Sequence, residues 1–107
     1  MEAVMATAPQ LMYPHITHDP EVRAGKACIE GMRIAVVDIV LLQKRGHTPE
    51  EMQTYYMRFL TLAQVHSALA YYYDNPEEID AHFERAERAV AELEADRAEY
   101  LRRNAAQ

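Results

Sequence analysis

The stretch that decides the fold reads Thr61-Leu-Ala-Gln-Val-His-Ser-Ala-Leu-Ala-Tyr-Tyr-Tyr-Asp74. Its apolar residues recur at steps of three and four, which places them on one face of a helix. They are Leu62, Val65, Leu69 and Tyr72. Thr61 caps the first turn and Gln64 completes a capping box, and the helix ends at Asn75 because a residue that precedes proline avoids the α region.

The rest of this helix carries the first candidate function. Tyr71 is expected to point away from the apolar stripe, whereas Tyr72 and Tyr73 are expected in the core. An exposed first turn with Thr, Gln, His and Ser is typical of a recognition helix, because such side chains reach base edges in a major groove. An ordinary core helix explains the stretch equally well.

Two shorter helices are predicted before this one. The apolar run from Val36 to Leu42 is compatible with a strand, but Lys44 and Arg45 suit the end of a helix and Gly46 suits its left-handed cap, so we predict a helix over 37–45. Thr48-Pro49-Glu50-Glu51 then starts a second helix. Its apolar face is expected to be Met52, Tyr55, Tyr56 and Phe59. A buried helix followed by two closely connected helices is the helix-turn-helix layout.

The N-terminal part of the chain has a different character. Residues 1–12 show no periodicity and are predicted to be a loose tail. From Tyr13 to Val37, turns at Gly25 and Gly31 separate short extended pieces. We therefore predict a mainly α domain over 13–75, with a helix-turn-helix core of homeodomain-like or winged type and a short extended N-terminal segment. Whether residues 25–36 form a wing stays open.

A long amphipathic helix is predicted over 76–107. Asn75-Pro76-Glu77-Glu78 repeats the start signal, and a heptad pattern follows, with Arg97 interrupting it. From Pro76 to Arg103 the helix would measure roughly 40 Å, longer than a three-helix core can cover. It is expected to bind a second copy or another protein, or else to fold back on its own domain. The predicted partner-binding residues are Ile79, Phe83, Ala86, Val90, Leu93 and Tyr100.

Composition limits the function further. The formal charge of -6 on 107 residues argues against unspecific coating of nucleic acid, which relies on neutralised phosphates. From Glu21 to His47, however, five basic residues face three acidic ones, so a local basic surface is compatible with the sequence. The predicted DNA-binding residues are Arg33, Lys44, Arg45, Thr61, Gln64, His66 and Ser67, with Arg23 and Lys26 as further phosphate contacts. Solvated surface charges are the alternative.

The sequence predicts neither catalysis nor a metal or cofactor site. No serine or cysteine lies in a nucleophile motif and no two acids form a general acid and base pair, so we expect no catalysis. His15, His18 and Cys28 lack the second ligand pair of a structural zinc site, and we expect neither metal nor cofactor. A single cysteine excludes an internal disulfide. Without a signal peptide or membrane span, the expected compartment is the cytoplasm.

An ordered series of motifs resembles a known family. It consists of Ile16-Thr-His-Asp-Pro-Glu-Val22, Gly25-Lys-Ala-Cys-Ile-Glu-Gly-Met-Arg-Ile-Ala-Val36, Gly46-His-Thr-Pro-Glu-Glu-Met52 and Leu60-Thr-Leu-Ala-Gln-Val-His-Ser-Ala-Leu-Ala-Tyr-Tyr-Tyr73. Together these motifs resemble the domain-of-unknown-function family 433. The resemblance implies a homeodomain-like or winged helix-turn-helix fold. It also implies an antitoxin that binds and silences a ribonuclease toxin of the PIN class and represses its own operon.

The chain departs from the family pattern at several positions. Ala27 and Ala35 replace prolines that are usual in the family. Glu30 adds a carboxylate to this segment, which counts against tight binding to DNA phosphates. From the resemblance as a whole, we predict a bacterial antitoxin of a toxin-antitoxin pair. The alternative is a homodimeric helix-turn-helix transcriptional regulator that has no toxin partner.

Overall fold

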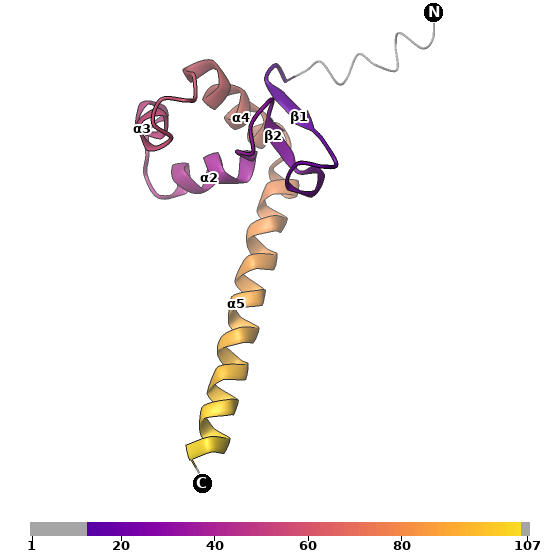
Figure 1. The fold of residues 1–107 in the computed structure, drawn as a ribbon, viewed down its shortest axis with the longest axis vertical. Coiled ribbons are helices and arrows are strands. Elements are labelled where there is room, and N and C mark those ends of the chain that lie inside the picture. The colour runs from indigo at the N-terminus through magenta and orange to yellow at the C-terminus, as the bar shows by residue number, and fades with distance from the viewer. Residues whose placement is uncertain (1–12, 106–107) are drawn as a thin grey trace, which may run out of the picture. The chain divides into compact units, whose positions relative to one another are not determined.

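The computed structural model describes residues 13–105 (Figure 1). In chain order the elements are β1 (Ile16–His18), the 3-10 turn η2 (Arg23–Gly25), β2 (Ala27–Ile29), α2 (Val36–Lys44), α3 (Pro49–Tyr55), α4 (Leu62–Asp74) and α5 (Pro76–Ala105). The prediction of a mainly helical chain with a short extended segment and a long C-terminal helix is confirmed. The chain divides into two compact units between Pro76 and Glu77.

The helix starts follow from side chains close in sequence. Before α3, Thr48 Oγ1 accepts the N–H of Glu51 at 3.1 Å, and Glu51 Oε1 accepts the N–H of Thr48 at 2.8 Å. Thr61 and Gln64 make the same reciprocal pair before α4, at 3.1 and 2.9 Å. Each pair satisfies two backbone donors that the first turn leaves open. The predicted capping box of Thr61 and Gln64 is confirmed, and Thr48 and Glu51 form a second one.

The extended segment forms a small hairpin that belongs to the core of its unit. β1 and β2 are antiparallel, with Thr17 opposite Cys28. Cys28 also forms a bridge to Ala35, the residue that precedes α2. All three residues of β2 are buried, and the strand contacts both α2 and α4. The hairpin therefore covers a side of α4 that the other two helices leave open.

The orientation of α4 differs from the prediction, because the hairpin packs on a side of the helix that was expected to face solvent. Tyr71, which was predicted to point outward, is only 7% exposed, whereas Tyr73, which was predicted in the core, is 61% exposed. The Tyr71 ring lies edge-on to the Tyr13 ring at 5.0 Å between centroids, and its hydroxyl is 3.1 Å from Nε2 of His18. The helix thus buries a second side. Val65, Ala68 and Leu69 complete its buried residues.

The second unit consists of α5. All residues from Glu84 to Ala105 are exposed, whereas Ile79 near the start of the helix is buried. Glu99 forms ion pairs with Arg102 and Arg103 one turn further on. No helix within residues 13–105 is both long and apolar enough to cross a lipid bilayer.

Candidate interaction surface

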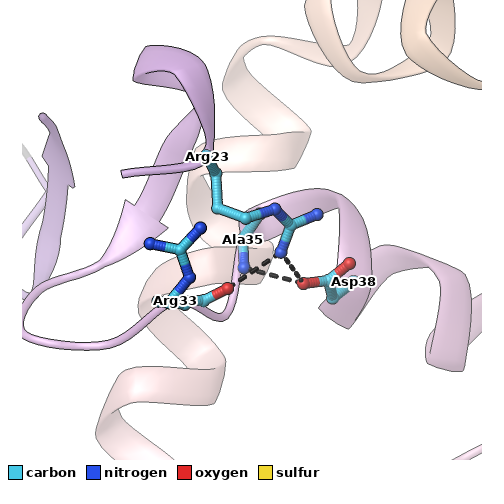
Figure 2. A network of polar contacts seen from close by, with 4 residues as sticks. All are labelled: Arg23, Arg33, Ala35 and Asp38. Carbon is cyan, nitrogen blue, oxygen red and sulfur yellow. Dashed lines mark hydrogen bonds and ion pairs between the residues drawn. The ribbon is translucent and has the colours of Figure 1, made fainter. Parts of the chain in front are cut away.

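Arg23, one of the predicted phosphate contacts, forms its hydrogen bonds within the chain. Arg23 Nη1 donates to Oδ2 of Asp38 at 2.9 Å and to the carbonyl oxygen of Arg33 at 2.8 Å (Figure 2). The same carboxylate oxygen accepts the N–H of Ala35 at 2.9 Å. The hydrogen bond to Asp38 raises the pKa of Arg23 above its ordinary value. Arg23 therefore fixes η2 against the start of α2.

The predicted basic surface is divided between the two ends of α2. Arg33 is exposed just before this helix begins, whereas Lys44 and Arg45 are exposed where it ends. A helix of nine residues is about 13 Å long at 1.5 Å per residue. The structure therefore does not gather Arg33 with Lys44 and Arg45 into one basic cluster.

The predicted recognition helix presents little to a nucleic acid. The polar side chains of Thr61 and Gln64 form the capping box, and Ser67 is half-buried, which leaves His66 exposed. α4 contains no Lys or Arg. Its exposed residues before Asp74 are Leu62, Ala63, His66, Ala70 and Tyr73. DNA-binding helices draw much of their affinity from basic contacts to phosphate, and this surface offers none of its own.

Exposed apolar side chains gather in sequence around the connection between α3 and α4. Met57 is 78% and Phe59 is 72% exposed, and Tyr55 and Leu62 on either side are exposed as well. We call Tyr55, Met57, Phe59 and Leu62 the turn patch. Tyr55 and Phe59 were predicted on the apolar, inward face of the second helix, and that prediction is wrong. α3 ends at Tyr55, so its period does not continue to Phe59.

The backbone of the connection holds the turn patch outward. Met57 and Arg58 both adopt left-handed conformations, with φ of 56° and 66°. The N–H of Arg58 donates to the carbonyl oxygen of Gln53 at 2.7 Å. Left-handed backbone at a residue other than glycine costs roughly 1–2 kcal/mol. Such strain is found at functional sites, where the surrounding structure maintains it.

The core then fixes the far end of the connection. Leu60 is 1% exposed, and its carbonyl oxygen accepts a hydrogen bond from the Gln53 side chain at 2.8 Å. With Leu60 anchored, the preceding Phe59 lies outside the core. Sequence reasoning missed this patch because it treated every apolar residue at helical spacing as buried. One signal was available in the sequence: α4 and the connection before it contain more apolar residues than a single buried helix face can hold.

The histidines and the cysteine do not form a metal centre. His15 and His18 are exposed, whereas Cys28 is buried in β2. Burial raises the pKa of the Cys28 thiol. Between residues 13 and 105, no three His, Cys, Asp or Glu side chains are grouped so that they could hold a metal ion.

The predicted partner-binding residues of α5 differ in exposure. Ala86, Val90, Leu93 and Tyr100 are exposed, Phe83 is half-buried, and Ile79 is buried. The exposed residues lie on the predicted heptad seam, so the outer part of α5 is a second candidate surface.

Comparison with known proteins identifies the family. The family described as "Protein of unknown function (DUF433)" matches residues 16–72, which include β1, β2, α2, α3 and α4 up to Tyr72. The chain is also similar to the crystal structure of a DUF433 member protein from Anabaena variabilis ATCC 29413. That similarity has 31% identity and a TM-score of 0.60, and it covers 76% of this chain and 78% of the other. No curated protein matches the sequence. The family match extends over more than half of the chain, and this protein therefore belongs to the DUF433 family.

Proposed function

We propose that this protein is a non-enzymatic antitoxin that binds a PIN-like ribonuclease toxin through the turn patch and blocks its activity. The observation that carries a protein partner is the exposure of Met57 and Phe59 on a connection whose backbone is fixed at both ends. Contiguous exposed apolar surface on a small soluble domain is characteristic of interaction sites. Aromatic residues and Met are also the residue types enriched in protein interfaces.

Exposed side chains continue in sequence from the turn patch along α4. Leu62 and Tyr73 contribute large apolar side chains, and His66 and Ala70 lie between them in sequence. A protein partner gains affinity from burying such side chains, whereas a DNA duplex requires positive charge that α4 lacks. This contrast favours a protein partner over DNA.

Charge supports a ribonuclease as that partner. An enzyme that binds RNA needs basic surface to contact phosphates. The formal net charge of this chain is -6, and the segment from Thr61 to Gln107 contains ten acidic and five basic residues. Opposite charge accelerates association and steers the orientation of the partners. An acidic antitoxin is therefore suited to cover the substrate surface of a basic ribonuclease.

Co-expression with the product of the adjacent gene tests this proposal. A complex is expected to co-purify, and RNA cleavage is expected to appear when this chain is removed. Phe59→Ser should reduce the recovered complex, and Glu30→Ser, at an exposed loop position outside the patch, should not. Equal recovery of the complex with both variants would contradict binding through the turn patch.

A homodimeric transcriptional regulator is the second candidate. It is favoured by the exposed Arg33 and Arg45 and by His66 in the first turns of α4. In that case Arg33→Ala should weaken binding to DNA of every sequence, whereas His66→Ala should change the preferred sequence. Fluorescence anisotropy at fixed salt measures operator binding. Operator binding that Phe59→Ser leaves unchanged, with no ribonuclease recovered on co-expression, would favour this candidate over the antitoxin.

A further inference from the structure

The outer part of α5 carries a seam over about three heptads, and this seam is exposed from Ala86 onward, whereas Phe83 is half-buried. Its seam positions are Phe83, Ala86, Val90, Leu93, Arg97, Tyr100 and Asn104. Leu93 is 69%, Tyr100 59% and Val90 54% exposed. Most helical stability in proteins comes from packing of the apolar face. A partner that covers this seam would supply that packing.

We propose that a second copy of this chain covers the seam as an antiparallel coiled coil, with Val90 of each copy opposite Leu93 of the other. The inference concerns α5 alone and goes beyond the proposed function, because it requires no toxin. It assigns the seam to self-association, whereas the turn patch remains the surface for the toxin.

The position of Arg97 selects the antiparallel direction. In a parallel, in-register pair the two Arg97 side chains would face each other in the seam, and like charges at such close range oppose association. In the antiparallel arrangement Arg97 lies opposite Ala86, which leaves room for the long side chain. The two Arg97 residues are then 11 positions apart along the axis, roughly 16 Å at 1.5 Å per residue.

The same register places large apolar side chains in matching layers. Phe83 of one copy lies opposite Tyr100 of the other, and the Val90 and Leu93 layers form the centre of the pair. Displacing one helix by a heptad would bring Arg97 opposite Leu93 or Ile79 instead of Ala86. The proposed register therefore combines the longest overlap with the smallest side chain opposite Arg97.

The charges along α5 favour a second copy as the partner that covers the seam, because Arg97 of one copy would lie beside Glu87 of the other. A shallow, mostly apolar depression on α5 is lined by Ala86, Glu87, Val90, Ala91 and Glu94. Within residues 13–105, Arg97 makes no ion pair. In the proposed register Arg97 enters the end of the depression formed by Ala86 and Glu87 of the second copy. Its own Glu94 is one turn away, so the guanidinium offsets the repulsion between Glu87 and Glu94 of opposite copies.

Disulfide trapping of the full-length chain tests the direction and register. The double variant Ala86→Cys/Arg97→Cys is expected to give a covalent dimer under mild oxidation on a non-reducing gel, because the two positions face each other. Arg97→Cys alone should not, since the two copies of that position are far apart. The unmodified chain is the control, because its Cys28 is buried. Efficient cross-linking of Arg97→Cys alone would indicate a parallel pair and overturn the proposal.

A charge exchange tests the contact itself by sedimentation equilibrium. Arg97→Glu should raise the dimer dissociation constant by about tenfold or more, because it places like charges together twice in the dimer. Glu87→Arg/Arg97→Glu should restore it. Arg88→Glu makes the same charge change on the outer face and should have little effect. A chain that stays monomeric, or a double variant as weak as Arg97→Glu, would overturn the proposal, with circular dichroism confirming that α5 is intact. These measurements use the chain alone, so their failure would leave the toxin interaction standing.

Discussion

The side-chain amide of Gln53 in α3 donates a hydrogen bond to the carbonyl oxygen of Leu60, 2.8 Å away across the connection to α4. Leu60 is buried, so this bond joins a helix to the anchored end of an otherwise exposed connection. The residues between them include Met57 and Phe59, whose side chains are directed to solvent. The relationship explains how a short segment holds apolar side chains at the surface in a defined conformation.

Gln53→Ala is expected to lower the free energy of unfolding by about 1 kcal/mol, because a partly buried carbonyl loses its partner. It should also weaken capture of the toxin, since the turn patch loses its fixed geometry. Urea denaturation measures the first effect and co-purification the second. Gln43→Ala is the matched control, because it removes an exposed side-chain bond, that to the hydroxyl of Tyr73. Equal loss of stability in the two variants would show that the bond across the connection has no special role.

Arg58→Gly is expected to stabilise the protein by about 1 kcal/mol, because glycine adopts a φ of 66° without the steric penalty of other residues. Thermal unfolding measures the change. Arg45→Gly removes the same side chain at a position with a φ of -88°, where no such strain exists, and should not stabilise. If both substitutions lower the melting temperature alike, the connection is not strained at Arg58.

Arg23→Ala is expected to destabilise the chain by at most about 1 kcal/mol, because the Arg23 and Asp38 side chains are both partly exposed to solvent. A double-mutant cycle with Asp38→Ala should show favourable coupling between the two residues. Lys26→Ala, in the neighbouring segment, should leave stability nearly unchanged. Absence of coupling in the cycle would mean that the network in Figure 2 does not contribute to folding.

Stability is expected to decline at alkaline pH. Burial raises the pKa of the Cys28 thiol above its ordinary value of 9.0 and that of the Tyr56 hydroxyl above 10.0. The folded state therefore keeps these protons when the unfolded state has lost them, and the unfolded state gains relative stability as pH rises. The contribution of the protonated thiol to stability is complete below pH 9.0, and it is lost as pH rises through the raised pKa of the folded state.

The free energy of unfolding should accordingly be level from pH 7 to about 8.5 and fall above 9.0. Urea denaturation across this range checks the prediction. Cys28→Ala should remove the first part of the decline but retain the later part, which comes from tyrosine. A profile for Cys28→Ala that parallels the unmodified chain at every pH would show that the thiol does not contribute.

The fold was predictable where local chemistry determines it. Thr48 and Thr61 cap helices through residues three positions away, so the starts of α3 and α4 can be read from short stretches. The environment of Tyr71 and Tyr73 was not predictable in this way. The hairpin that contains His18 is far away in sequence, and it covers one side of α4 that periodicity alone assigns to solvent.

The candidate site shows the same division. Basic residues such as Arg33 and Arg45 are exposed, as their charge leads one to expect. The turn patch was missed because the left-handed backbone at Met57 and Arg58 has no glycine to indicate it. Tertiary anchoring of Leu60 maintains this conformation, and sequence patterns do not report such anchoring.

The most direct test of the account is the affinity of the product of the adjacent gene, the proposed ribonuclease toxin, for this chain, measured by isothermal titration calorimetry with the unmodified chain and with Phe59→Ser. We predict a stoichiometric complex that suppresses RNA cleavage, and an affinity at least about tenfold weaker for Phe59→Ser, because an exposed aromatic anchor is lost. Equal affinity of the two proteins, with cleavage suppressed in both cases, would contradict the central claim that the turn patch binds the toxin.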